Sequence, residues 1–232
     1  VIESLTQNNL KPIVTLHHFT NPNWFLDSGG WSCERNTIHF ITYLKKVVEA
    51  LKDKVDTWLI FNEPMVYIYN SFISGIWPPG EKSLAGAKKV IQNIIKAYCI
   101  GYEEIHKIYD NISKPVNVSL AKNIRIFCPC PDSIKPLSAI SVFLRDKYFN
   151  FWMLEPLHKK KYLDFLGLNY YCREYDKFEG LLGAECGHKF HQERKNYLGW
   201  NIDPQGFYEA LLKLKKFNLP IIITENGTAE NK

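Results

Sequence analysis

The chain contains the sequence Trp58-Leu59-Ile60-Phe61-Asn62-Glu63-Pro64, in which four apolar residues lead into an amide, a carboxylate and a proline. A short apolar run of this kind is typical of a buried parallel strand, and we expect a strand over residues 57–62. Proline disfavours helical geometry in the residue before it. The pattern therefore predicts that Glu63 is held at the end of a buried strand.

A second stretch repeats this arrangement and reads Pro220-Ile221-Ile222-Ile223-Thr224-Glu225-Asn226-Gly227. We expect a strand over residues 220–224. Glu225 follows this strand as Glu63 follows the first, and Gly227 permits a tight turn directly afterwards. The sequence thus predicts two carboxylates, each delivered by the end of a strand.

Strand patterns alternate with helix patterns along the rest of the chain. Further strands are expected near residues 13–18, 115–121 and 164–171, and helices over residues 37–52, 83–109, 137–154 and 204–217. Asn36 is expected to cap the first of these helices. The alternation predicts an α/β fold in which the five strands are parallel neighbours in chain order, joined by right-handed crossovers. Long segments follow the strands, where parallel α/β proteins place their sites, at residues 20–35, 65–82 and 172–200.

The composition is that of a folded globular protein, because 46% of the 232 residues are apolar and 23% are charged. The net charge is only +5, and the longest basic run is residues 159–161, which argues against nucleic-acid binding. No apolar run reaches the roughly 18 residues of a membrane span. No glycine-rich phosphate-binding pattern follows a strand, and residues 1–10 do not resemble a targeting peptide. We therefore expect a cytoplasmic protein that binds neither nucleic acid nor membrane.

Six cysteines are scattered at positions 33, 99, 128, 130, 172 and 186, and none forms a CxxC pair. Free thiols in a reducing compartment are the expected state. Asn-x-Ser/Thr sequons occur at Asn111, Asn117 and Asn226. Asn226 directly follows one of the two strand-end glutamates, where a glycan would block the site, and this weighs against a secreted glycoprotein.

Polar residues stand at or just after the end of each predicted strand, in segments 17–19, 62–64, 121–123, 169–171 and 224–227. Polar segments that follow apolar strands on one face are typical of a site built by several loops. Two carboxylates on such a face meet the needs of glycoside hydrolysis. One must be protonated to donate to the leaving oxygen, and the other must be ionised to attack the sugar carbon or to activate water. The alternative from spacing alone is that each glutamate makes a helix N-cap contact or a surface ion pair.

The two glutamate segments, residues 58–64 and 221–227, resemble the signature segments of glycoside hydrolase family 1, the β-glucosidase family. Three further segments resemble motifs of this family in the family's order, namely Thr15-Leu16-His17-His18-Phe19, residues 163–171, and Gly199-Trp200 with Asp203-Pro204-Gln205-Gly206-Phe207-Tyr208. Five motifs in order are far more specific than one, and together they cover most of the chain from residue 11 to residue 228.

The resemblance implies a (β/α)8 TIM barrel that cleaves β-glycosides with retention, through a covalent glycosyl-enzyme and without a metal or organic cofactor. Glu63 matches the acid/base of the family and Glu225 matches its nucleophile. A retaining mechanism would place their carboxyl groups about 5–5.5 Å apart. The expected enzyme is a glycoside hydrolase of the O-glycosyl β-glucosidase type, whose partner is a small-molecule β-glucoside or β-galactoside.

The resemblance also implies residues that bind the sugar or support the catalytic pair. Asn62 matches the residue that binds the sugar 2-hydroxyl. His18 matches a ligand of the other sugar hydroxyls, and Phe19 stands where the family often has tryptophan. Asn169 and Tyr171 match supporting residues, and Tyr171 corresponds to the one that hydrogen-bonds the nucleophile.

Several neighbouring residues leave two interpretations open. Trp24, Trp31 and Trp77 lie in loops that follow strands, where they either stack on sugar rings or pack within the loops. His17 is expected to be structural. Lys122 and Asn123 are expected at the rim of the site.

The resemblance covers about five of the eight βα units of the family, from the third to the seventh. The first two strands of the family, with a Gln and an Arg, and the eighth, with Trp and Glu sugar ligands, have no counterpart in this sequence. We therefore expect residues 1–232 to form a single partial barrel catalytic domain, a fragment. As an isolated chain it should hydrolyse β-glycosides poorly or not at all, and its unpaired strand edges should favour association.

Other functions remain open at this point. The main alternative is a catalytically silent carbohydrate-binding or scaffold remnant of such a barrel, against which the presence of both Glu63 and Glu225 argues. An S-glycosidase of the myrosinase type is disfavoured, because that group lacks the acid glutamate. The sequence leaves open the sugar, the aglycone, the use of phosphorylated glycosides and the oligomeric state.

Overall fold

The computed structural model describes residues 1–131, 133–178, 184–185 and 195–229. The chain divides into two compact units, which are considered in turn. Unit 1 consists of residues 1–122 and 157–167, and unit 2 consists of residues 123–156 and 168–232. Cys186 and much of the predicted loop 172–200 lie outside the described residues.

The sheet of unit 1 is parallel, as predicted. Strand β1 (Ile13–His17) pairs with β2 (Thr57–Asn62), and β2 pairs with β3 (Asn117–Asn123). The first half of β5 (Leu166–Asn169) lies beside β3, so close that a Cβ on Gly167 would lie 2.7 Å from the carbonyl oxygen of Leu120. The second half of β5 belongs to unit 2 and is followed in the sheet by β8 (Ile221–Glu225), which gives the order β1-β2-β3-β5-β8. The predicted strand order is confirmed.

The bounds of two strands differ from the prediction by two residues at each end. β3 begins two residues later than expected, where the amide of Asn117 donates to the carbonyl of Asp56 (2.8 Å). β5 is shorter than residues 164–171 because the side chain of Asp164, rather than its backbone, accepts from the amide of Val118 (2.7 Å). Side-chain hydrogen bonds of this kind compete with the regular ladder.

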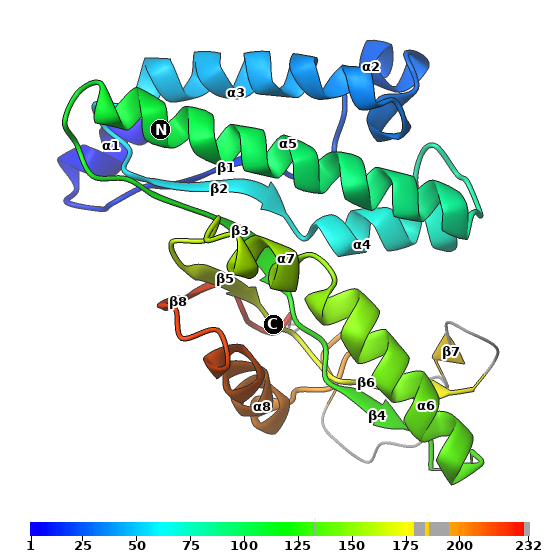
Figure 1. The fold of residues 1–232 in the computed structure, drawn as a ribbon. Helices are drawn as coiled ribbons and strands as arrows, with labels where there is room; N and C mark the ends of the chain where they lie inside the picture. The colour runs from blue at the N-terminus through cyan, green and yellow to red at the C-terminus, as the bar shows by residue number, and fades with distance from the viewer. Residues whose placement is uncertain (132, 179–183, 186–194, 230–232) are drawn as a thin grey trace. The chain divides into compact units, whose positions relative to one another are not determined.

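Helices α3 (Thr37–Leu51) and α5 (Leu84–Asp110) pack against each other in unit 1, as Figure 1 shows. Their apolar residues face inward, and Leu44, Val48, Val90, Ile94, Ala97 and Ile105 are buried. The interface is tight, because a Cβ on Gly101 would lie 2.8 Å from Cδ1 of Leu44. The remaining short helices of this unit are α1 (Ile2–Gln7), α2 (Asn23–Asp27) and α4 (Pro64–Ile68).

The prediction that Asn36 caps α3 is wrong. Asn36 stands at the N-cap position, but its side-chain amide donates to the carbonyls of Ser28 (3.2 Å) and Gly30 (3.0 Å) instead of accepting from the helix. The preceding loop folds into 3₁₀ turns, Gly30–Ser32 and Glu34–Asn36, whose carbonyls need such donors. Short turns of this type carry no periodic signal, which is why the sequence did not predict them.

The helix predicted over residues 137–154 is interrupted in unit 2. It consists of α6 (Lys135–Arg145) and a π-helical segment, Asp146–Phe151, and is followed by α7 (Leu154–Lys159). The side chain of Asn150 accepts from the amide of Arg125 (3.0 Å) and donates to its carbonyl (2.8 Å). The helix is π-helical, and therefore wider, at the residue that makes these bonds outside the helix. The last helix, α8 (Pro204–Lys215), begins where the sequence predicts and ends two residues earlier.

Unit 2 also contains a small sheet that the sequence did not predict. Strand β4 (Phe127–Pro129) pairs in parallel with β6 (Glu174–Lys177), which pairs antiparallel with β7 (Ala184–Glu185). The strands are only two to four residues long, so no hydrophobic alternation marks them. Charged side chains join the sheet to α6, because Arg145 of α6 forms ion pairs with Glu174 and Asp176, both on β6.

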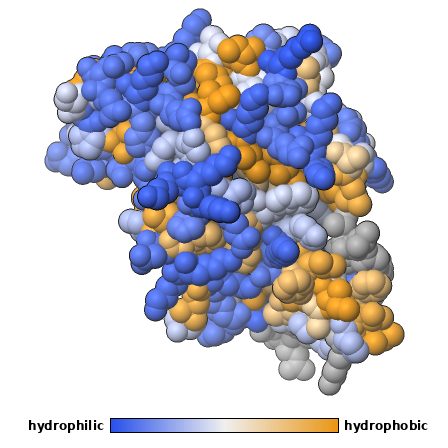
Figure 2. Space-filling view, viewed as in Figure 1, coloured by the Kyte–Doolittle hydropathy of each residue, from blue (hydrophilic) through white to orange (hydrophobic). Residues whose placement is uncertain are grey.

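These ion pairs explain an unusual feature of α6. Its buried side chains are the polar Ser138, Ser141 and Arg145, whereas Ile140 and Phe143 are 48% and 64% exposed. The helix therefore presents its apolar side outward, and Figure 2 shows an orange area in the part of the view where Figure 1 places α6. A helix that binds a charged sheet has to turn its polar side inward.

The expectation of free thiols holds for Cys33, Cys99, Cys128 and Cys172, but it is wrong for Cys130, which is disulfide-bonded. The amide of Cys130 donates to the carbonyl of Asp176 (2.8 Å), so the small sheet fixes its position. Spacing along the sequence does not reveal such pairings. Among the described residues, no helix has the length and apolar character needed to cross a bilayer.

Candidate active site

Glu63 is fixed by its backbone at the point where β2 passes into α4. It adopts left-handed dihedral angles, φ 43° and ψ 53°, and Pro64 begins the helix. Its amide donates to the carbonyl of Ala121 on the neighbouring strand β3 (2.8 Å), and its carbonyl accepts from the amide of Val66 (2.9 Å). A left-handed conformation is rare for a residue with a side chain, and such strain gathers at functional sites. The predicted departure of Glu63 from helical geometry is confirmed.

Two further predicted site residues meet beside Glu63. The side-chain amide of Asn62 donates to Nε2 of His18 (3.0 Å). Asn62 and Glu63 are buried, whereas His18 is exposed. His18 therefore forms the outer surface of this part of unit 1, and a ring whose Nε2 accepts from Asn62 carries a proton on Nδ1.

Phe19 continues this surface, and it too has a positive φ, 68°. Its ring meets His18 edge-on at 4.8 Å and tilts against Trp77 at 5.0 Å. Phe19, Tyr67 and Trp77 are among the residues that line a cleft of about 420 Å³. The cleft therefore has an aromatic wall, to which Phe19 of the predicted site contributes.

His17 lies on the other side of β1 and is buried. Its ring lies within 6.2 Å of the rings of Trp31, Phe40, Phe61 and Tyr67. Burial lowers the pKa of His17 to about 4, so the ring is neutral at pH 7. This environment fits the structural role expected for His17, and Trp31, which is 2% exposed, packs within the same cluster. Trp24 is 56% exposed and rests on Phe25 and His39.

Asn21 organises this cluster, and sequence reasoning missed it. Its Oδ1 accepts from Nε1 of Trp31 (3.1 Å) and from Nε2 of His17 (3.1 Å). Its Nδ2 donates to the carbonyl of Phe19 (3.2 Å) and to the hydroxyl of Tyr67 (3.4 Å). Asn21 thus ties the aromatic cluster to the strained residue Phe19. Its place in a polar segment directly after a predicted strand was the available signal.

Glu225 is the last residue of β8 in unit 2, and side chains hold its carboxylate. The hydroxyl of Tyr171 donates to Oε2 of Glu225 (2.7 Å). The amide of Tyr170 donates to the carbonyl of Glu225 (3.0 Å), and Nδ2 of Asn226 donates back to the carbonyl of Tyr170 (2.7 Å). The segment after β5 therefore holds both the backbone and the carboxylate of Glu225. Gly227 follows with φ 149°, a conformation that favours glycine, as predicted.

Asn169 supports the same strand end from within unit 2. It is fully buried, and its Oδ1 accepts from the hydroxyl of Thr224. Its carbonyl accepts from the amide of Ile124 (3.0 Å).

Lys122, which the sequence places at the rim, is only 1% exposed, so that expectation is wrong. Its position near the end of the central strand β3 explains the burial.

The structure brings the predicted site residues together in two groups. His18, Phe19, Asn62 and Glu63 form one group in unit 1, and Asn169, Tyr171 and Glu225 form the other in unit 2. In the second group, sequence reasoning also missed Asp203, which binds both Tyr170 and Arg173. The sequence Asp203-Pro204 was recognised as a helix start, but nothing in it signals a link to the strand end.

A parallel sheet whose strands alternate with helices and end in polar residues defines an α/β type of protein. Residues 1–163 match the family model described as glycosyl hydrolase family 1, and the chain belongs to this family. The relationship confirms the resemblance seen in the motifs.

Known proteins of this family resemble the whole chain. A β-galactosidase from Pyrococcus woesei is 30% identical over 100% of this chain and 56% of its own length. β-Glucosidase A from Thermotoga maritima is 24% identical over 99% of this chain and 56% of its own. Among solved structures, a β-glycosidase from Pyrococcus horikoshii is 33% identical, with a TM-score of 0.88 over 100% of this chain and 56% of that chain.

The chain thus spans slightly more than half the length of these relatives, and its fold is that of part of a (β/α)8 barrel.

Proposed function

We propose that the chain carries the two catalytic carboxylates of a retaining β-glycosidase acting on β-glucosides or β-galactosides. The observation that supports this most directly is the hydrogen bond from Tyr171 to the carboxylate of Glu225. A hydroxyl donor stabilises the ionised form of a carboxylate, and the ionised form is the one that attacks carbon. The family membership supports the same assignment.

In the first step, a carboxylate oxygen of Glu225 attacks the anomeric carbon while the carboxylic acid of Glu63 donates its proton to the leaving glycosidic oxygen. The bond to the aglycone breaks, and a covalent glycosyl-enzyme forms. In the second step, Glu63 removes a proton from water, and the water oxygen displaces Glu225. Two displacements return the original configuration at the anomeric carbon.

The residues beside Glu63 would bind the sugar. Asn62 offers an amide to the 2-hydroxyl, and the exposed ring of His18 offers its Nδ1 proton to a further hydroxyl. Phe19 and Trp77 supply the apolar wall. The hydrogen bond between Asn62 and His18 fixes the positions of these two side chains relative to each other.

The test is to trap the glycosyl-enzyme with 2,4-dinitrophenyl 2-deoxy-2-fluoro-β-glucoside and its galactoside. The fluorine slows the second step, so even a slow enzyme accumulates the adduct. We expect one sugar per chain, located on Glu225 by peptide mass spectrometry. Glu49→Gln, a change at an exposed glutamate on α3, is the matched control and should label normally.

Two outcomes would overturn the proposal. An adduct on another residue would remove Glu225 from its role. Binding of a β-glucoside without any adduct after prolonged incubation would favour the silent carbohydrate-binding alternative. For chains that do turn over, proton NMR of the first product should show the β-anomer, and the α-anomer would contradict retention.

A further inference from the structure

Asp203 is the centre of a buried hydrogen-bond network at the start of α8. Its Oδ2 accepts from the hydroxyl of Tyr170 (2.7 Å) and from Nε of Arg173 (2.7 Å). Its Oδ1 accepts from the other end of the Arg173 guanidinium (3.0 Å) and from the amide of Gly206 (2.9 Å). Each oxygen therefore receives two hydrogen bonds, which is a fully satisfied buried carboxylate.

The charge state of Asp203 fits this arrangement. Burial alone would raise the pKa of Asp203, but the hydrogen bonds from Arg173, Tyr170 and the Gly206 amide outweigh it and hold the pKa below its ordinary value. Burial and the bond to Asp203 raise the pKa of Tyr170, so its hydroxyl remains a donor. The network is therefore a fixed anion surrounded by donors at neutral pH.

Gly206 gives independent support, because only glycine leaves room for this contact. A Cβ at position 206 would lie 1.9 Å from the hydroxyl oxygen of Tyr170 and 2.2 Å from Oδ2 of Asp203. Glycine is a poor residue inside a helix, yet it occupies the first turn of α8. Its presence is explained by the approach of Tyr170 to Asp203.

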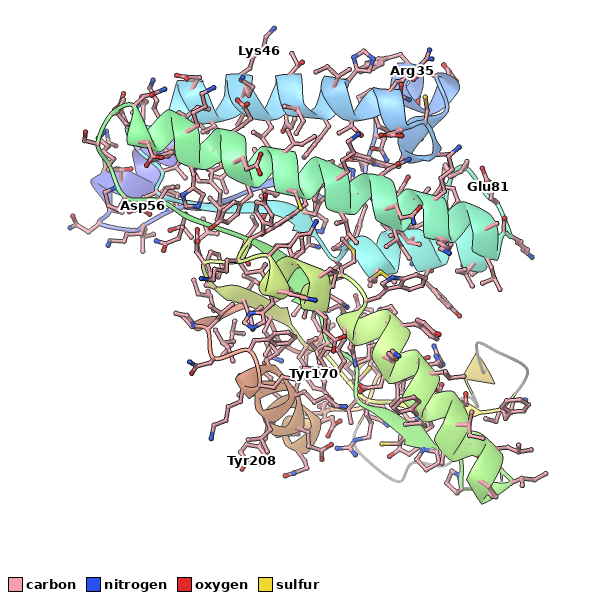
Figure 3. The ribbon with its side chains drawn as sticks, viewed as in Figure 1. Arg35, Lys46, Asp56, Glu81, Tyr170 and Tyr208 are labelled. Atoms are coloured by element: carbon pink, nitrogen blue, oxygen red, sulfur yellow. The ribbon has the colours of Figure 1, made fainter. Side chains whose placement is uncertain are left out.

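The network leads directly to the candidate nucleophile. Asp203 binds Tyr170 and Arg173, which flank Tyr171 in the chain, and the ring of Phe207 stacks on Tyr170 at 6.0 Å. Tyr171 in turn holds the carboxylate of Glu225, and Tyr170 holds its backbone. Figure 3 shows Tyr170 beside α8, whereas Tyr208 points away from the helix.

We propose that Asp203 is a positioning residue for Glu225, which it sets through the segment of Tyr170, Tyr171 and Arg173. The proposal rests on the proposed function in one respect, the role of Glu225 as nucleophile. Asp203 does not touch the substrate. It anchors residues 170 and 173, so that the hydroxyl of Tyr171 between them stays aligned with Oε2 of Glu225.

The test uses the whole chain labelled with [13Cζ]tyrosine, in which the signal of Tyr171 is assigned by its loss in Tyr171→Phe. The Cζ shift reports the hydrogen bond of the hydroxyl. We expect Asp203→Asn and Gly206→Ala to move the Tyr171 signal toward that of a solvent-exposed tyrosine while the chain remains folded. Tyr208→Phe, a change at an exposed residue of the same helix, should remove its own signal and leave that of Tyr171 in place.

A merely structural role for Asp203 would lower stability and leave the Tyr171 signal of the folded chain unchanged, and this result would overturn the proposal. If Asp203→Asn does not fold, Tyr170→Phe removes a single hydroxyl and provides the same readout. Asp203→Glu, which keeps the charge, should shift the signal less than Asp203→Asn does.

A second readout is the rate of covalent trapping at Glu225. Misplacement of a reacting group by about 1 Å costs on the order of 100-fold, so Asp203→Asn should slow trapping by about that factor. If the unmodified chain does not react at all, this result concerns the proposed function alone, and the tyrosine signal still decides the role of Asp203.

Discussion

The surroundings of Glu63 and of Glu225 hold a carboxylate in two different ways. Glu63 is directed by its own backbone, which is locked in a left-handed conformation between β2 and α4. Glu225 ends an ordinary strand, and the hydroxyl of Tyr171 holds its carboxylate. Main-chain geometry fixes the backbone of Glu63 at its strand end, and a tyrosine hydroxyl binds the carboxylate of Glu225.

This difference fits the different tasks proposed for the two residues. An acid/base has to exchange a proton twice per turnover, and the left-handed backbone of Glu63 stays at the strand end throughout. A nucleophile has to direct one oxygen at the anomeric carbon, and the hydroxyl of Tyr171 positions the carboxylate of Glu225. We therefore expect changes at the two ends to have different consequences.

The largest difference should appear when each glutamate is replaced. Glu225→Gln replaces the attacking carboxylate with a neutral amide, and trapping by the fluorinated glucoside should fall at least about 10³-fold. Glu63→Gln removes only proton donation, whose contribution is about 10²–10⁴-fold and depends on the leaving group. It should therefore slow cleavage of an alkyl glucoside much more than that of the dinitrophenyl glucoside, which needs little protonation.

Rates of both substrates with both variants provide the measurement. Equal losses on the alkyl and dinitrophenyl glucosides would argue against Glu63 as the acid. Trapping of Glu225→Gln at the unmodified chain's rate would argue against Glu225 as the nucleophile.

The sequence predicted the strand ends better than the surroundings of the two glutamates. Apolar runs marked β2 and β8, and Pro64 and Gly227 indicated how each strand terminates, because these signals are local. The contacts made by Asn21 and Asp203 join segments that are distant in the chain, and no local pattern reports them. The sequence did not predict the small sheet of β4, β6 and β7 for the same reason, since its strands are too short for apolar alternation and ion pairs to distant Arg145 position β6.

Lowering the pH should reduce the stability of the aromatic cluster around His17 and of the Asp203 network in different pH ranges. The pKa of His17 is lowered by burial to about 4, against 6.5 in the unfolded chain, so the unfolded state binds more protons between these values. Stability around the aromatic cluster should therefore fall as the pH drops from 6.5 to 4, by about 3 kcal/mol in total. The pKa of Asp203 is below its ordinary value of about 3.9, so its contribution is retained until the pH falls below about 4.

Urea unfolding at several pH values between 7 and 3 provides the measurement, with fluorescence of the buried Trp31 as the probe of unit 1. His17→Phe keeps a ring in the cluster and should flatten the dependence between pH 6.5 and 4. An unchanged slope in this variant would show that another group titrates there.

Backbone strain at Glu63 should be visible as a gain in stability when it is relieved. Asparagine tolerates the left-handed region better than glutamate does, so Glu63→Asn should raise the free energy of unfolding by about 1 kcal/mol. The matched change Glu225→Asn relieves no strain and loses the bond from Tyr171, so it should lower stability. Equal losses in the two variants would contradict the view that only Glu63 is held under strain.

The smallest effect should come from Asn226, an exposed residue that directly follows Glu225. Asn226→Ala removes the hydrogen bond to the carbonyl of Tyr170, and water can replace the lost donor because residue 226 is exposed. We expect a loss of about 0.5 kcal/mol in the free energy of unfolding, at the lower end of the range for a single hydrogen bond. The Tyr171 signal should move little, because Asp203 still holds Tyr170 from the other side. A shift as large as that of Asp203→Asn would mean that the bond from Asn226, rather than the buried network, aligns Tyr171 with Glu225.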